Sequence, residues 1–443
     1  MDNEYSKVRF ALIALLIISL GGCGSESNDQ SQGDVISEDD SNPDDDGSGG
    51  VESPRYIEGV VSTHHNNNAC AAIKTDGSVV TWGYNASGGD SSYATLDNIN
   101  HIHSSNTSFA AVNSDGKLVN WGYFTWNNRI NLSFEGIERI FSTQQAFAAI
   151  KVDGSIITWG EDDHGGDSST VDLNNVKEIF SNSFAFAALK NDGTVVAWGN
   201  EDNGGDTPSL AIDDVKDIYS NPYAFAALKN DGTVVAWGNQ NNGGNSSGLA
   251  INDVKEIYSN SSSFAALKND GSVETWGDLS SGGDEPDYNY DWLTYIDSIQ
   301  GVKEIYSTNR AYAALKNDGT VVTWGDNSYG GNSSNVILDN VKTIYSTINA
   351  FAALKNDGTV VTWGDPTWGG DSSSVSLEDI VDIYSTSSSF AAVNAAGAVS
   401  IWGVSPMGDH LTQDQLSGAK DVYSSSVCGW VLKEGGGLFV WEK

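Results

Sequence analysis

Residues 350–364 read AFAALKNDGTVVTWG, and this stretch decides the fold. VKTIYST precedes it at residues 341–347, and DPTWGGDSSSVSL follows at residues 365–377. Short β-branched and aromatic runs broken by turn residues are typical of strands. The pattern predicts three of them, Lys342–Ser346, Ala350–Lys355 and Thr359–Trp363.

Asp357-Gly358 predicts a two-residue hairpin between the second and third strands, because a type I′ turn needs positive φ at both central positions. Along the second strand, Phe351 and Ala353 point to one side and Ala350 and its alternating neighbours to the other. Both sides are apolar, so both must be covered. Sheets standing side by side satisfy this, each laying a bulky Phe and Trp face on the small Ala face of the next.

The same unit recurs ten times, because a Trp follows a Gly by five residues at a nearly constant interval. These residues are Trp82, Trp121, Trp159, Trp198, Trp237, Trp276, Trp324, Trp363, Trp402 and Trp441. A fixed period of this length indicates a repeat architecture. We therefore expect an all-β fold of ten short, mostly three-stranded blades over residues 55–443.

We expect these units to form one closed ring, because no linker divides them. Two smaller rings and an open superhelix are the alternatives. The first unit starts at its first strand and the last ends at its third. No exchanged strand is therefore expected to join the two ends.

The N-terminal residues are typical of an export signal. Lys7 and Arg9 precede a ten-residue apolar run, which is too short to span a bilayer. The small residues before Cys23 resemble the lipobox of bacterial lipoproteins, which implies removal of residues 1–22 and acylation of Cys23. Gly24 rather than Asp follows, which resembles sorting to the outer membrane. An ordinary signal peptide with an incidental Cys is the alternative.

Residues 23–54 contain ten acidic side chains and no Lys or Arg. Such a composition cannot bury enough apolar area to offset its ordering entropy, so it predicts a disordered tether. The whole chain has a formal charge of −37, and residues 55–443 hold 47 acidic and 20 basic side chains, a formal charge of −27. That field repels phosphates, so we expect neither nucleic acid nor a lipid surface as partner, apart from the lipid anchor itself.

The wording FAALKNDGTVVTWGD, with an Ile-rich strand before it and a Gly-Gly loop after it, resembles the repeat of the regulator of chromosome condensation family, which implies a β-propeller. The period of about 39 residues is closer to the secreted bacterial β-lactamase-inhibitory propeller protein, whose blades have three strands. Ten units exceed the seven usual in those relatives.

Cys70 and Cys428 lie in the first and last units, at neighbouring positions of the second strand that point to opposite faces. Facing surfaces of the first and last units of a ring would present these two side chains to each other. We therefore predict a disulfide between them, in an oxidising compartment. Two separate buried thiols are the alternative.

Departures from the repeat are the candidate binding residues, since blade interiors are committed to packing. Unit six carries an insertion rich in aromatic residues, and two further Trp lie in equivalent loops. The predicted binding residues are Tyr288, Tyr290, Trp292, Tyr295, Trp126 and Trp368. Exposed aromatics suit protein or sugar contacts. The insertion could equally fold back on its own blade.

Two other patterns contain residue types that bind metals. The recurring GGDSS-type loop could offer oxygen ligands to calcium, but Asx turns that bond their own backbone explain it better. The histidines of the first two units, His64, His65, His101 and His103, have no fixed ligand spacing. We expect no metal and no cofactor.

The sequence contains no nucleophile elbow, no HExxH and no phosphate-binding loop, so we do not expect an enzyme. The leading hypothesis is a monomeric outer-membrane lipoprotein, periplasmic or at the cell surface, that binds another macromolecule, most simply a protein. A carbohydrate-binding or carbohydrate-processing propeller is the second hypothesis. Guanine-nucleotide exchange is a remote third that rests on the family resemblance alone.

Overall fold

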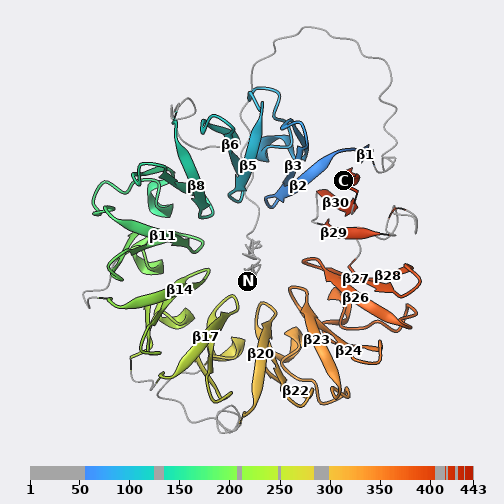
Figure 1. Cartoon of the computed structure of the whole chain (residues 1–443). Coiled ribbons are helices and arrows are strands. Elements are labelled where there is room, and N and C mark those ends of the chain that lie inside the picture. Colours follow the sequence, from blue (N-terminus) through green and yellow to red (C-terminus); the bar gives the residue numbers. More distant parts are fainter. Residues whose placement is uncertain are drawn as a thin grey trace, which may run out of the picture.

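The computed structural model describes residues 55–123, 134–206, 212–247, 251–283, 299–404, 415, 418–424, 428–433 and 435–442. Ten small antiparallel sheets stand side by side around one central opening (Figure 1). The predicted all-β propeller of ten short units is confirmed. Nine sheets have three strands and the last has four.

Each unit consists of a first, a second and a third strand in chain order, and the first strand lies nearest the central opening (Figure 1). The first strands are β2 (Val60–His65), β5 (Ile99–Ser104), β8 (Ile137–Ser142), β11 (Val176–Ser181), β14 (Val215–Asn221), β17 (Val254–Ser259), β20 (Val302–Ser307), β23 (Val341–Ser346), β26 (Ile380–Ser385) and β29 (Ala419–Ser424). The second strands are β3 (Ala69–Lys74), β6 (Ser108–Asn113), β9 (Ala146–Lys151), β12 (Ala185–Lys190), β15 (Ala224–Lys229), β18 (Ser263–Lys268), β21 (Ala311–Lys316), β24 (Ala350–Lys355), β27 (Ser389–Asn394) and β30 (Cys428–Lys433). The third strands are β4 (Val79–Gly83), β7 (Leu118–Gly122), β10 (Ile156–Gly160), β13 (Val195–Gly199), β16 (Val234–Gly238), β19 (Val273–Gly277), β22 (Val321–Gly325), β25 (Val360–Gly364), β28 (Val399–Gly403) and β31 (Leu438–Glu442).

Within the described ranges, seven third strands are followed by one turn of 3₁₀ helix. These are η1 (Asn85–Ser87), η2 (Asp162–His164), η3 (Glu201–Asn203), η4 (Gln240–Asn242), η5 (Leu279–Ser281), η6 (Asn327–Tyr329) and η7 (Pro366–Trp368). In the part of the chain that the structure describes, no helix is long and apolar enough to cross a membrane.

The two ends of the sheets form two faces of the molecule. On the hairpin face lie the starts of the first strands and the hairpins between second and third strands, which are hydrogen-bonded to each other, as from Ile380 N–H to Gly358 C=O. On the turn face lie the turns between first and second strands and the 3₁₀ helices.

The hairpin differs from the predicted type I′ turn. Gly358 has φ +82°, but Asp357 is not among the residues with positive φ. Gly358 N–H donates to Lys355 C=O, and Asp357 Oδ1 accepts the Thr359 N–H at 3.0 Å and its hydroxyl at 2.7 Å. The Asx turn holds Asp357 at negative φ, so the loop is a type I turn closed by a single left-handed Gly.

Neighbouring units pack as expected, with a bulky face against a small one. Ala311 and Ala313 of unit seven contact the face of unit eight that carries Phe351 and Trp363. Phe351 and Trp363 stack with their ring centroids 5.1 Å apart, and both are buried. The core is therefore a circle of separate clusters, one at each junction between units.

A Gly-Gly pair follows the third strand in seven units, and the packing at the junction requires it. Gly330 (φ +93°) caps η6, and an added Cβ would lie 2.6 Å from the Phe351 ring of the next unit. A Cβ on Gly331 would lie 2.2 Å from the carbonyl oxygen of Gly325. The Trp363 indole N–H donates to Gly330 C=O at 3.0 Å, so the Trp binds the loop of the preceding unit.

Turns on the turn face are joined to one another by main-chain hydrogen bonds. Among the described residues the donors are Asn67, Asn106, Gln144, Ser183, Ser261, Asn309 and Ile348, each bonded to a carbonyl of the next unit. Pro222 accepts from Ser183 but has no N–H to donate onward. These bonds link successive units around the central opening.

We call the junction between unit ten and unit one the seam. Strand β1 (Arg55–Ile57) pairs antiparallel with β31 and gives the last sheet its fourth strand. This corrects the expectation that no strand joins the ends: the residues just before unit one form a short strand that covers the otherwise free edge of β31.

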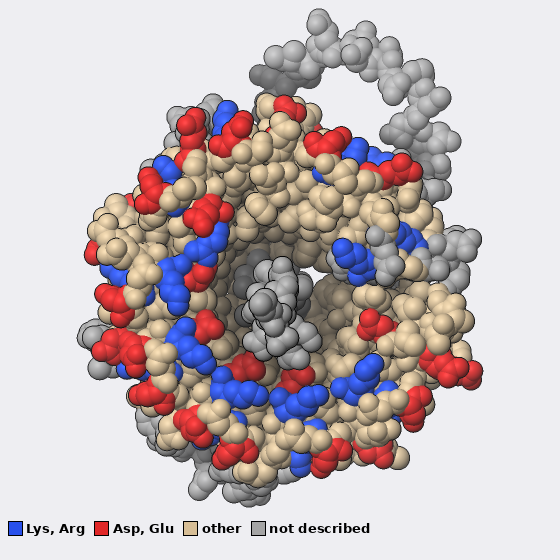
Figure 2. Space-filling model, in the orientation of Figure 1, with Lys and Arg blue, Asp and Glu red and all other residues tan. Residues whose placement is uncertain are grey.

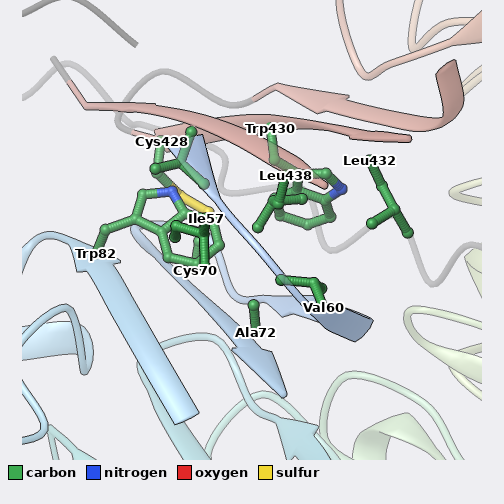
Figure 3. Close-up of a cluster of buried hydrophobic side chains, with 10 residues drawn as sticks. Ile57, Val60, Cys70, Ala72, Trp82, Cys428, Trp430, Leu432 and Leu438 are labelled. Atoms are coloured by element: carbon green, nitrogen blue, oxygen red, sulfur yellow. A yellow bond between two sulfur atoms is a disulfide. The ribbon is translucent and has the colours of Figure 1, made fainter. Parts of the chain in front are cut away.

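The predicted disulfide is present at the seam, between Cys70 and Cys428 with their Cα atoms 6.4 Å apart (Figure 3). Cys70 occupies the position that holds Phe351 in unit eight, so the unit-one side of this junction has lost a large ring. Trp430 of unit ten, where unit seven has Ala313, fills that space. It meets Trp82 edge-on at 6.1 Å between centroids.

Candidate functional site

The rim of the central opening on the hairpin face is the candidate site, because there the units differ in charge. Each first strand contacts the first strand of the next unit along the chain, so equivalent positions follow one another around the opening. Units four to eight carry Lys at the second position of this strand. We call Lys177, Lys216, Lys255, Lys303 and Lys342 the lysine arc.

The lysine arc faces solvent, and all five side chains are exposed. Figure 2 shows Lys and Arg gathered in an arc around the opening, over β11 to β23, with Asp and Glu mostly toward the outer rim. Units one, two, three and nine carry Val61, Asn100, Glu138 and Val381 at the same position. Unit ten carries Lys420, which is exposed and is separated from the arc by Val381. The unbroken run of positive charge therefore occupies one side of the rim, and Lys420 stands apart from it.

The arc lysines differ from the lysines that end the second strands. Lys190, Lys229, Lys268 and Lys355 form ion pairs with Asp172, Asp213, Glu274 and Asp339, at 2.6–3.2 Å, with only 12–20% of each lysine side chain exposed. Within the described residues, no arc lysine lies within ion-pair distance of a carboxylate. The arc charges are thus available to a ligand.

A band of carboxylates follows the arc one residue deeper along the strands, at Glu178, Asp217, Glu256 and Glu304, all half-buried. Glu178 is neutralised by Arg139 of unit three, whose Nη1 lies 2.5 Å from Oε2. Burial raises the pKa of Asp217, although Lys216 and Lys177 oppose the shift.

Tyrosines from the same strands donate hydrogen bonds to two of these carboxylates. Tyr258 donates to Glu256 at 2.8 Å and Tyr306 to Glu304 at 2.9 Å. Burial, followed by the charge of Glu256, raises the pKa of Tyr258, and burial raises that of Tyr306 to about 12. At neutral pH these phenols are protonated and donate hydrogen bonds. The carboxylates of Glu256 and Glu304 are therefore held by the tyrosines, one residue further along the strands than the lysines.

The histidines occupy the opposite side of the opening, in units one and two. Burial, with a smaller effect from neighbouring imidazoles, lowers the pKa of His64 to about 3 and that of His103 to about 4. His65 stacks on Tyr423 of unit ten at 3.7 Å between centroids. Among the described residues, no group of three or more His, Cys, Asp or Glu is placed to hold a metal ion. These imidazoles are therefore part of the packing near the seam.

Of the six predicted aromatic binding residues, the structure describes Trp368. Trp126, Tyr288, Tyr290, Trp292 and Tyr295 lie outside the described residues, as does Cys23. Trp368 is half-buried at the end of η7, and its main-chain carbonyl accepts a hydrogen bond from the Thr347 hydroxyl at 2.9 Å.

The GGDSS-type loops form Asx turns, as expected. Asp90, Asp167 and Asp371 each accept a hydrogen bond from the main-chain N–H two residues later, at 2.8–2.9 Å. The carboxylate oxygens thus serve the loop itself.

Two groups of exposed residues escaped the sequence analysis. The recurring sequences VKEI, VKDI and VKTI at the starts of the first strands could have predicted the lysine arc. Tyr84 and Tyr123 follow Trp-Gly in units one and two, where unit three has Glu161 and unit eight Asp365, and they are 59% and 55% exposed.

Comparison with known proteins supports the repeat and adds no partner. Residues 302–330 match the family model of the regulator of chromosome condensation repeat. No curated protein matches the chain.

Among solved structures, the computationally designed Ika8 protein is 16% identical, with a TM-score of 0.33 over 70% of this chain and 96% of its own. Prp20p from Saccharomyces cerevisiae is 15% identical, with a TM-score of 0.31 over 72% of this chain and 75% of its own. The ectodomain of the Physcomitrella patens receptor kinase CR4 is 12% identical, with a TM-score of 0.35 over 70% and 74%. These similarities are too low to transfer an activity or a partner.

Proposed function

We propose that this protein is a lipid-anchored, extracytoplasmic propeller that binds another protein at its exposed rims and catalyses no reaction. One observation carries the proposal: the broad faces of the repeated sheets are buried between neighbours, so chemistry that differs between units is exposed chiefly at the rims and loops. A scaffold of this kind presents varied side chains on rigid strands.

The binding part of the proposal can be tested by photo-cross-linking in cells. A photoreactive residue is placed singly at Val61 and Val381, which are 54% and 50% exposed at the opening, and at Val152, 75% exposed at a hairpin tip away from it. We expect one protein to be trapped from the rim positions and not from Val152. Absence of any cross-linked protein from all three positions would reject a protein-binding role.

The anchoring part rests on the first 23 residues and needs its own experiment. We expect labelled palmitate to enter the wild-type chain and to be absent from Cys23→Ser, which should leave the membrane fraction. Label in both proteins would show that Cys23 is not the acylation site.

Carbohydrate binding is a second candidate, favoured by exposed tyrosines in units one and two. Tyr93 is 62% exposed, and its hydroxyl accepts the Gly122 N–H at 2.7 Å, which places it beside Tyr123. Exposed phenol rings offer flat apolar surfaces with a polar edge, which suits stacking on sugars. Binding on a glycan array that disappears in Tyr84→Ala/Tyr123→Ala would support this candidate, and unchanged binding would reject these residues.

A further inference from the structure

The charge of the repeat region is distributed unevenly. Residues 55–443 carry a formal charge of −27, yet the hairpin-face rim of units four to eight is lined by five lysines that form no ion pair within the described residues. Packing does not require these lysines, since the equivalent residue is Val61, Asn100 or Val381 in other units.

The strands impose an order on the arc. Successive first strands contact each other, so the lysines form a curved row with one positive charge per unit. The row ends at Glu138 on one side and at Val381 on the other. A ligand that uses the whole row must carry several negative charges along an extended stretch.

The carboxylate band restricts which negative ligand fits. Asp217 lies close enough to Lys216 and Lys177 for their charges to affect its pKa. A polymer with a charge on every residue, such as DNA or a sulfated glycan, would be repelled by this band and by the charge of the whole domain. A polypeptide with spaced carboxylates avoids this, because its main-chain N–H groups can donate to Glu256 or Glu304 while its acids reach the lysines.

We propose that the lysine arc binds an acidic segment of a partner protein, lying in an extended conformation along the hairpin-face rim of units four to eight. The proposal rests on the proposed protein-binding function and specifies its site and the chemistry of its partner. Exposed charge pairs contribute modestly one at a time, so affinity comes from several pairs and falls with salt.

The test measures fluorescence anisotropy of a fluorescein-labelled dodecapeptide of alternating Glu and Gly with the full chain in a non-ionic detergent. Wild type should bind the peptide, and the double variant Lys216→Glu/Lys255→Glu should bind about tenfold more weakly. The matched control Arg55→Glu/Lys117→Glu changes the net charge equally at exposed positions away from the arc and should bind like wild type. Glu138→Lys lengthens the arc by one unit and should bind about threefold more tightly.

Equal loss in the arc variant and the control would overturn the proposal, because net charge alone would then explain binding. Tighter binding of heparin or duplex DNA than of the peptide, abolished by the same arc variant, would also overturn it.

The cross-linking experiment at Val61 and Val381 separates the two proposals. A partner still trapped in Lys216→Glu/Lys255→Glu leaves the protein-binding function standing and rejects the arc as its site. Peptide binding at the arc without any trapped partner supports the site and rejects the function in cells.

Discussion

The junctions between interior units and the seam solve the same packing problem with different residues. At most interior junctions, a Phe and a Trp stack, and the Trp indole donates to the Gly carbonyl of the preceding unit, as Trp237 does to Gly204 at 3.1 Å. At the seam, Cys70 stands at the position of this Phe. A disulfide, Trp430 and the added strand β1 take its place.

The difference follows from chain connectivity. Interior units are tethered to both neighbours by the backbone, so weak repeated contacts suffice to keep them together. Units one and ten are 358 residues apart at the two cysteines, and bringing them together costs loop-closure entropy that no interior junction bears. The additional links are therefore concentrated where the chain provides none.

The largest effect is expected from removing the covalent link. Cys70→Ala/Cys428→Ala should lower the free energy of unfolding by about 2–5 kcal/mol, since the disulfide restricts the unfolded chain over a very long loop. Urea denaturation of both proteins with and without dithiothreitol measures this. The reductant should shift the wild type toward the variant and leave the variant unchanged. An unaltered wild-type midpoint would show that the seam does not depend on the bond.

A somewhat smaller effect is expected from crowding an interior junction. In Gly331→Ala the new Cβ would overlap the Gly325 carbonyl oxygen, and the stability loss should be about 3 kcal/mol. Gly136→Ala is the control, because its φ is +72° but no atom lies within 4 Å of the added Cβ, so only about 1 kcal/mol of backbone strain is expected. Thermal unfolding of the two variants compares them, and equal losses would mean that the close approach is relieved by a small shift of the loop.

The contribution of the indole hydrogen bond to stability can be measured by making the same Trp→Phe substitution at two junctions. Trp237→Phe removes a hydrogen bond and leaves the buried Gly204 carbonyl unpaired, whereas the Trp82 N–H has no acceptor among the described residues. Trp237→Phe should therefore cost about 1 kcal/mol more than Trp82→Phe. Chemical denaturation of both gives the difference, and a greater loss at Trp82 would contradict the comparison.

The smallest effect concerns pH near the seam. The pKa of His64 is about 3 and that of His103 about 4 in the folded protein, against 6.5 for a free imidazole. The unfolded chain therefore binds protons that the folded chain does not. The stabilisation is complete above pH 6.5 and declines as the pH falls toward 4, by less than about 1.4 kcal/mol per pH unit for each imidazole, because both remain partly solvated.

His64→Tyr/His103→Tyr installs the residue that most first strands carry and should reduce this decline between pH 6.5 and 5. A part due to His65 should remain, because burial lowers its pKa to about 4 as well. Urea midpoints of wild type and variant across that range provide the comparison. Parallel curves would assign the acid sensitivity to His65 and the surface carboxylates instead.

Several features of the fold could be predicted from the repeated wording alone. The three strands of unit eight, the alternation of Phe351 with Ala350 and Ala352, and the pairing of Cys70 with Cys428 all follow from a period of two within a strand and a period of 39 along the chain. Recurrence makes such inferences strong, because every unit must satisfy the same geometry.

Other features could not be predicted. The hairpin type depends on whether Asp357 accepts a hydrogen bond from Thr359 or adopts positive φ. The sequence Asp-Gly is compatible with both. Strand β1 could not be predicted because a three-residue segment is too short to show an alternating pattern. It forms a strand only by pairing with the edge strand β31 of unit ten. The aromatic insertion of unit six lies outside the described residues, so its role remains a sequence-based prediction.

The sequence by itself determined the unit: which residues form strands, which face is bulky, and that each unit needs a neighbour to cover it. Only the tertiary structure decided which distant residues share a surface. Lys177, Lys255 and Lys342 are far apart in the chain and look like isolated surface charges. They form one positive rim because the first strand of every unit lies nearest the central opening. Residues at the same position of successive first strands therefore lie next to each other.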